Sequence, residues 1–423
     1  MSEAAVAVVA LLIGVWALAS GWAARYEVTG PITFTFAGYL LGNPDWGPLD
    51  IAVGTSSLHT IAEVTLVLIL FSDAARVHMA ELRRDVALPT RLLGIGLPLS
   101  VILGGLIAAA LLDALPWALA GFLGAALAPT DAALSAQVIG DERIPMRLRR
   151  GLNVESGLND GIATPIVTVM LAIAASQIGV ITESEAFEAF AALRELAIGV
   201  VVGLGFGWLG ARLIALATTR HWVAPGGRRI AVLALAIGAF ATTLAADGNG
   251  FVAAFTAGIV FGTTLDRRTT DLERSTELPE LAGQLLALVV WFLFGATLVP
   301  IGLEYVDLPI LVYAVASLTV VRMIPVGLAM YRSGLDRPSV VFLSWFGPRG
   351  LASVVFALLA IEELGETSVL VNEAVATVSI TVLLSVILHG VSATPGGRRY
   401  AQREQQEEDA AHPPRPRLTG PSA

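Results

Sequence analysis

The sequence predicts an all-α protein that crosses a membrane many times. Two features of its composition indicate this: 55% of the 423 residues are hydrophobic, and only 14% are charged. Soluble domains carry about 25% charged residues, so this chain has too little charge to cover a water-facing surface. The third observation is a series of apolar runs near the length of about 20 residues that a spanning helix needs.

We predict thirteen transmembrane spans from these runs. They lie near residues 4–23, 29–42, 57–74, 92–112, 115–139, 151–175, 190–217, 229–246, 250–264, 282–302, 308–330, 338–361 and 369–392. The first run follows Met1-Ser2-Glu3, which is acidic where a secretory leader is basic. We therefore expect it to be an uncleaved span.

The basic residues predict the orientation. All 26 are arginines, and arginine is retained in cytoplasmic loops. If the N-terminus lies outside, the loops after spans 3, 5, 7 and 9 are cytoplasmic, and they contain Arg76, Arg83, Arg84, Arg91, Arg143, Arg147, Arg149, Arg150, Arg220, Arg228, Arg229, Arg267, Arg268 and Arg274. The opposite loops are acidic or neutral. We expect a multi-pass protein of the inner cell membrane, N-terminus outside and C-terminus cytoplasmic.

Two further features limit the function. Residues 396–423 are polar and proline-rich, which predicts a disordered cytoplasmic tail. The chain has no cysteine, Walker loop, Gly-x-Ser-x-Gly or His-x-x-x-His pattern, which argues against an ATP-driven pump and against a membrane-embedded enzyme. We expect no cofactor and no nucleic-acid partner.

The fifth span is interrupted by Pro129-Thr130-Asp131. Proline breaks a helix, and a broken helix exposes its carbonyl groups and a positive half-helix end near the middle of the membrane. Thr130 and Asp131 add a hydroxyl and a carboxylate at this break. We interpret it as part of an ion site, with a simple proline kink as the alternative.

The sixth span carries two acids, an amide and a hydroxyl. Glu155 and Asn159 are four residues apart and share one helix face, and Ser156 and Asp160 share the adjacent face. Hard cations prefer oxygen ligands, and burial makes a carboxylate easier to protonate. The same site can therefore hold either a cation or a proton. The alternative is a cytoplasmic loop, with the helix beginning near Ile162.

The twelfth span is broken at Gly347-Pro348-Arg349-Gly350, seven spans after the first break. Two interrupted helices at matched places predict inverted repeats around a central site. Charges inside spans are expensive and need partners. Arg322, in the eleventh span, would pair best with Glu155, which leaves Asp160 as the carrier, but Arg349 could take the same role. Asp73 either lines the cytoplasmic entrance or caps the third span.

Over residues 1–395 these motifs together resemble the sodium/proton exchanger superfamily, in particular its cation:proton antiporter-1 branch. The resemblance rests on Pro129-Thr130-Asp131, Glu155-Ser156 with Asn159-Asp160, the intramembrane Arg322 and the Arg349-Gly350 element. It implies an NhaA-like fold and a homodimer. A moving core would comprise mainly residues 90–180 and 308–393, and a dimerisation scaffold mainly residues 1–85 and 225–305.

The resemblance also implies individual roles. Asp160 would be the carboxylate that binds the ion or the proton, with Thr130, Asp131 and Ser156 as further ligands and Asn159 beside it; the ion bridge of Glu155 would be structural. Electrogenic relatives carry Asp-Asp at this pair and a lysine in the core. The Asn159-Asp160 pair and the lack of lysine therefore favour electroneutral exchange.

We expect a secondary active transporter that exchanges Na⁺ or Li⁺ for H⁺ by elevator-type alternating access. K⁺/H⁺ exchange is the alternative within the same class, because the ligand chemistry of the two ions overlaps. A channel or a non-transporting receptor is the alternative from another class, but no repeat typical of a selectivity filter is present.

Overall fold

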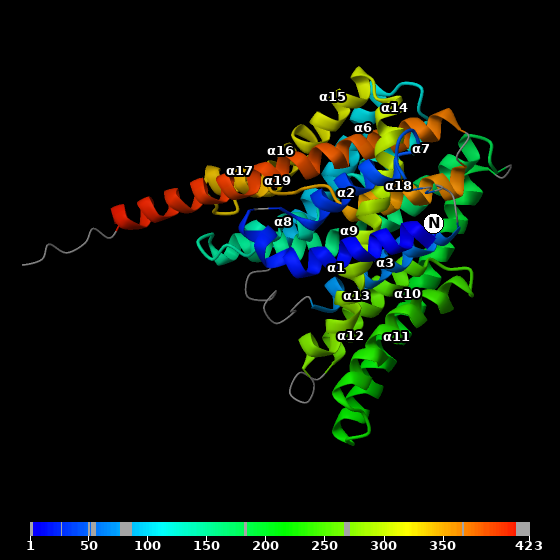
Figure 1. Ribbon diagram of the computed structural model, residues 1–423, viewed down its shortest axis with the longest axis vertical. Helices are drawn as coiled ribbons and strands as arrows, with labels where there is room; N and C mark the ends of the chain where they lie inside the picture. The colour runs from blue at the N-terminus through cyan, green and yellow to red at the C-terminus, as the bar shows by residue number, and fades with distance from the viewer. Residues whose placement is uncertain are drawn as a thin grey trace, which may run out of the picture.

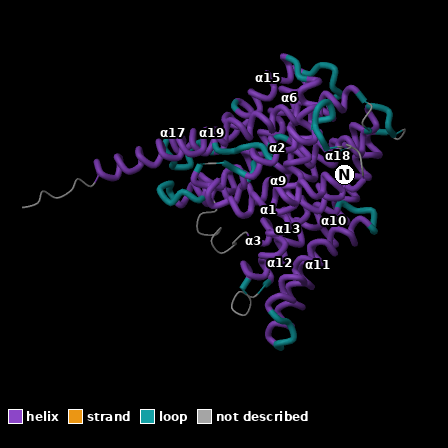
Figure 2. Tube along the Cα trace, in the orientation of Figure 1, coloured by secondary structure: helices purple, strands orange, loops and turns teal. Residues whose placement is uncertain are grey.

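In the computed structural model, the described residues are 3–26, 28–49, 51, 56–76, 87–181, 184–265, 271–365 and 368–411. In these ranges the chain forms helices joined by loops, with no strand (Figure 2). The prediction of an all-α polytopic membrane protein is confirmed. Arg83, Arg84, Arg267 and Arg268 of the basic loops lie outside the described residues.

The first half of the chain forms the helices up to α11. They are α1 (Glu3–Arg25), α2 (Gly30–Gly42), α3 (Ser56–Arg76), α5 (Ala87–Arg91), the π-helical turn η1 (Leu92–Gly96), α6 (Leu97–Leu111), α7 (Trp117–Ala126), α8 (Ala132–Ile139), α9 (Met146–Gln177), α10 (Glu185–Thr219) and α11 (Pro225–Leu244). In the middle of the bundle, α9 lies among helices from both halves of the chain (Figure 1).

The second half continues in the same way. Its elements are α12 (Gly250–Thr264), α13 (Leu272–Leu293), the π-helical turn η2 (Phe294–Leu298), α14 (Val299–Tyr305), α15 (Leu308–Leu318), α16 (Val320–Ala329), α17 (Arg337–Trp345), α18 (Leu351–Leu364) and α19 (Val369–Ala411). The end of α19 projects from the body of the molecule (Figure 1).

Each expected span overlaps one helix or a run of consecutive helices. Among the described residues, eight helical segments are long and apolar enough to cross a bilayer. The count of thirteen crossings stays a prediction, because α2, α12 and the halves of the broken helices are shorter than the roughly 20 residues of a full span.

Both predicted helix breaks are present. Helix α7 ends at Ala126 and α8 begins at Ala132; α17 ends at Trp345 and α18 begins at Leu351. The two intervening segments touch, because the backbone N–H of Asp131 donates to the carbonyl oxygen of Pro348 at 2.8 Å. The two interrupted helices therefore meet at their breaks.

The expectation of a disordered tail from residue 396 is wrong for residues 396–411, which continue α19. The cause is packing that the sequence alone does not reveal. Tyr400 is buried, its ring lies 4.5 Å from that of Phe342, and Arg403 pairs with Asp336 at 2.7 Å. Residues 412–423 lie outside the described residues.

Candidate ion-binding site

Helix α9 positions the four polar residues predicted for the sixth span. It begins at Met146, so Glu155, Ser156, Asn159 and Asp160 all lie within the helix and the loop interpretation is excluded. Glu155, Ser156 and Asn159 are buried, whereas Asp160 is half-buried. The carboxylates of this one helix therefore lie in different environments.

Glu155 forms an ion pair with Arg322. The guanidinium of Arg322 donates to both carboxylate oxygens, with Nη2 2.8 Å from Oε2 and a second bond from Nη1 to Oε1. The side chains are 1% and 2% exposed. Two parallel charge-assisted bonds in a buried site fix the position of the carboxylate. Of the two arginines considered, Arg322 is thus the partner of Glu155.

Arg349 bonds to carbonyl groups, and its expected place in the ion bridge needs correction. Its Nη1 donates to the carbonyl oxygens of Ala128 at 2.7 Å and Pro129 at 3.3 Å, and its Nη2 donates to that of Ser317 at 3.2 Å. The side chain is fully buried. Because the carbonyl end of a helix carries partial negative charge, Arg349 stabilises the end of α7 where Pro129 breaks it.

Asp131 stabilises the N-terminal ends of two helices. Its Oδ1 accepts hydrogen bonds from the N–H groups of Ala133 at 2.7 Å and Leu134 at 3.0 Å, at the start of α8. Its Oδ2 accepts from the N–H of Leu351 at 2.9 Å, at the start of α18. One carboxylate therefore caps two half-helices whose N-terminal ends are partially positive.

Thr130, Ser156 and Asn159 form a buried hydrogen-bonded group. The amide Nδ2 of Asn159 donates to Thr130 Oγ1 at 2.7 Å, and this hydroxyl lies 3.0 Å from Ser156 Oγ. Oδ1 of Asn159 has no hydrogen-bond partner among the described residues. The structure thus brings together the three small polar residues that the sequence placed on two different spans.

Asp160 faces a cavity of about 300 Å³. Within the described residues, no hydrogen bond or ion pair engages its carboxylate. The cavity is also lined by Asp73, Asp131, Asn153 and Ser156, and by Arg76 and Glu280, which pair with each other. Asp73 thus shares the cavity with Asp160, and its role at the cytoplasmic entrance stays a prediction.

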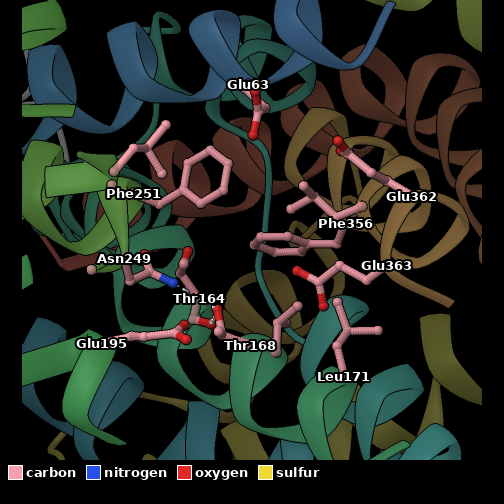
Figure 3. A pocket seen from close by; sticks show the side chains of 15 residues that line it. Glu63, Thr164, Thr168, Leu171, Glu195, Asn249, Phe251, Phe356, Glu362 and Glu363 are labelled. Carbon is pink, nitrogen blue, oxygen red and sulfur yellow. Dashed lines mark hydrogen bonds between the residues drawn. The ribbon is translucent and has the colours of Figure 1, made fainter. Parts of the chain in front are cut away.

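A second cavity, of about 320 Å³, lies further along α9 (Figure 3). Glu63, Glu195, Glu362 and Glu363 line it together with Thr164, Thr168 and Asn249, and the rings of Phe251 and Phe356 lie between the acidic groups. Thr164 Oγ1 donates to the carbonyl oxygen of Asp160 at 2.7 Å. Residues 153–160 of α9 therefore border the first cavity and residues 164–171 the second, so the two cavities follow one another along this helix.

This acidic cavity and a buried histidine were not predicted from the sequence. Glu195 is far in the sequence from the adjacent pair Glu362 and Glu363, and all three stand near span ends, where acids are ordinary. His389 is 2% exposed and lies near the second break, 3.0 Å from the carbonyl oxygen of Trp345. The available signal for His389 was that it is a polar residue in an otherwise apolar run.

Comparison with known proteins identifies the family. The model of the family described as "Sodium/hydrogen exchanger, transmembrane" matches residues 8–397. The chain belongs to this family. With its long apolar helices it is a multi-pass membrane protein.

Similar proteins include two curated antiporters. The chain is 26% identical over 395 residues to the K(+)/H(+) antiporter NhaP2 of Shewanella sp. (strain ANA-3), covering 92% of this chain and 66% of the relative. It is 27% identical over 373 residues to the K(+)/H(+) antiporter NhaP of Alkalimonas amylolytica, covering 87% and 62%. The chain thus spans less than two thirds of the length of these curated relatives.

The fold matches that of a solved antiporter. Superposition on the sodium proton antiporter MjNhaP1 from Methanocaldococcus jannaschii gives a TM-score of 0.74, with 94% of this chain and 98% of that chain covered at 20% identity. An electron-microscopy structure of the same protein gives a TM-score of 0.73. At this identity, the likeness concerns the arrangement of the helices.

Proposed function

We propose that this protein exchanges a monovalent cation for a proton, and that Asp160 binds the two in turn. One observation carries this proposal: of the three carboxylates at the crossing, Glu155 is paired and Asp131 caps two helices, whereas Asp160 has no partner among the described residues and faces a cavity. A half-buried carboxylate with no counter-ion favours binding a cation or a proton, because either neutralises its charge.

The neighbouring oxygens complete the proposed site. Ser156 and Asp131 line the cavity beside Asp160, and Thr130 lies one hydrogen bond further away through Ser156. Hydroxyl and carboxylate oxygens suit a hard monovalent cation. Asn159 supports the site by holding Thr130 in place. The transported ions are the substrates, and no cofactor is needed for this cycle.

We propose that the exchange is electroneutral. Arg322 pairs with Glu155, and the chain has no lysine that could release a second proton. Asp160 then changes its occupant one for one: one proton enters as one cation leaves. Transport in either direction moves no net charge.

Na⁺ and Li⁺ are the cations we propose first, and K⁺ is the second candidate. The fold is like that of MjNhaP1, which is a sodium proton antiporter. The curated relatives NhaP2 and NhaP are named K(+)/H(+) antiporters. Because the size of the occupied site decides between the ions, transport measurements with each cation are the appropriate test.

Alternating access by an elevator motion is the proposed mechanism. The crossing residues come from the proposed core, residues 90–180 and 308–393. Both cavities lie between this core and helices of the proposed scaffold: α3 lines both, α13 lines the cavity beside Asp160, and α11 and α12 line the other. A shift of the core along the scaffold would move Asp160 from one cavity toward the other. We further propose a homodimer through the scaffold, with the N-terminus outside and the C-terminus in the cytoplasm.

Proteoliposomes with an internal pH dye would test this function. An imposed pH gradient should collapse on addition of Na⁺, Li⁺ or K⁺ to the wild type, and clamping the voltage should leave the rate unchanged. A rate that follows the voltage would contradict electroneutrality. Cation flux without proton movement would instead favour a channel, and a folded protein that responds to none of these cations would favour a receptor.

A further inference from the structure

One stripe of helix α19 follows α17 and the break after it. The members of this stripe are three or four residues apart, so they face the same side of the helix. They are Ser385, His389, Ser392, Gly396, Tyr400 and Arg403. Helices α17 and α19 run beside each other in Figure 1. Side chains of the stripe contact α17 at Ser339, Phe342 and Trp345.

Ser385 and His389 hold the two ends of the broken segment, residues 346–350. The backbone N–H of Arg349 donates to Ser385 Oγ at 2.7 Å. His389 Nε2 lies 3.0 Å from the carbonyl oxygen of Trp345, the last residue of α17, and the two rings lie 5.2 Å apart. The indole N–H of Trp345 donates to Ser392 Oγ at 3.0 Å.

His389 lies between two carbonyl groups and the hydroxyl of Ser385. Its Nδ1 lies 3.0 Å from the carbonyl oxygen of Ser385 and 3.3 Å from Ser385 Oγ, and its Nε2 lies 3.0 Å from the carbonyl oxygen of Trp345. The imidazole therefore links α19 to the last residue of α17, next to the serine that accepts from Arg349 N–H.

The broken segment needs such support because it lacks the hydrogen bonds of a helix. Pro348 has no N–H group, and its carbonyl oxygen accepts from the N–H of Asp131. Asp131 in turn accepts from Leu351 N–H at 2.9 Å and lines the cavity with Asp160. A shift of the segment would therefore displace the capping carboxylate next to the ion site.

The same stripe also anchors the other end of α17. The Tyr400 hydroxyl lies 2.6 Å from Ser339 Oγ, which donates to Asp336, the residue that caps the start of α17. Arg403 pairs with the other oxygen of Asp336. The hydrogen bond from Ser339, and then Arg403, lower the pKa of Asp336. Helix α17 is thus fixed to α19 at both of its ends.

We propose that Ser385 and His389 are positioning residues for ion exchange: they fix the unwound segment 346–350 and, through it, Asp131 beside Asp160. This proposal rests on the proposed function. It predicts that loss of either side chain weakens cation binding more than it slows the turnover of the loaded carrier, because neither side chain touches the ion.

The test compares Ser385→Ala with Ser379→Ala in the full chain. Both serines are buried in α19, but Ser379 Oγ donates only to the carbonyl of Val375 in its own helix. We expect the apparent KM for the transported cation to rise about fivefold in Ser385→Ala, the factor that corresponds to one lost hydrogen bond. The maximal rate should change less, and Ser379→Ala should behave as the wild type.

The pair His389→Gln and His389→Leu tests the histidine. Glutamine can still donate to the Trp345 carbonyl and should retain most of the affinity, whereas leucine should raise the KM. Equal KM values for Ser385→Ala and Ser379→Ala, or for the glutamine and leucine variants, would overturn the proposal.

Amide hydrogen exchange followed by mass spectrometry provides a readout that does not depend on transport. Peptides containing residues 346–350 should exchange faster in Ser385→Ala than in Ser379→Ala. Faster exchange with no transport by the wild type would show that the segment is positioned as proposed but that the proposed function is wrong. Unchanged exchange, with transport intact in the wild type, would overturn the positioning role alone.

Discussion

The acidic groups on two faces of α9 lie in different environments. On one face, Glu155 is sealed from solvent and bound through both oxygens to Arg322. On the adjacent face, Asp160 is half-buried, unpaired among the described residues and open to a cavity. The comparison teaches that an intramembrane carboxylate can bind transported ions only if its neighbours leave its charge unsatisfied.

The largest expected effect comes from removing the charge on the open face. Asp160→Asn keeps the size of the side chain but can neither release a proton nor neutralise a cation. Cation-driven collapse of a pH gradient in proteoliposomes should fall about 100-fold or more, the usual range for loss of an essential group. Asp160→Glu is the matched control and should retain measurable exchange. Full exchange by Asp160→Asn would remove Asp160 from the mechanism.

Breaking the pair on the closed face should act on stability first. Glu155→Gln leaves Arg322 buried and uncompensated, and removing one partner of a buried pair costs about 3–5 kcal/mol. The double variant Glu155→Leu with Arg322→Leu should recover much of this loss, because no isolated charge remains. Thermal unfolding in detergent would measure both. If the single variant were as stable as the wild type, the pair would not be structural.

A smaller loss of stability is expected at the capping carboxylate. Asp131→Ala removes the acceptor for the starts of α8 and α18, and each lost cap costs about 1 kcal/mol. Asp131→Asn keeps one acceptor oxygen and should lose less. Melting temperatures of the two variants would show this order. An alanine variant as stable as the asparagine variant would mean that the caps do not stabilise the crossing.

Much of this site could be predicted from local sequence signals. Pro129 and Pro348 indicated both breaks, because proline interrupts a helix wherever it lies in the interior. The spacing of Glu155, Ser156, Asn159 and Asp160 indicated their two faces, and Arg322 needed the acidic partner that it has. Each of these conclusions follows from residues close in sequence or from the cost of a charge in the membrane.

The features that were missed depend on contacts between distant segments. Nothing near Arg349 in the sequence indicates that it binds the carbonyls of Ala128 and Pro129. Nothing near residue 396 indicates that α19 continues and brings Arg403 to Asp336. The acidic cavity depends on the meeting of α3, α10 and α18 beside α9. The composition of residues 396–411 suggested disorder, because composition carries no information about contacts with distant segments.

The smallest effect is expected for Asp73, which shares the cavity but lies on α3. Asp73→Asn lowers the negative potential that attracts cations into the cavity, so the apparent KM should rise about threefold, and less at high ionic strength because salt screens the interaction. Glu304→Gln, at an exposed acid at the end of α14, is the control. If both variants gave the same KM as the wild type, Asp73 would not belong to the entrance.

The most direct test of the account is proton release on cation binding to the purified protein in weakly buffered detergent solution. Addition of Na⁺, Li⁺ or K⁺ should release up to one proton for each cation bound to the wild type, because both compete for Asp160. Asp160→Asn should release none. Cation binding without proton release, or equal release from the wild type and Asp160→Asn, would contradict the claim that one carboxylate holds the two ions in turn.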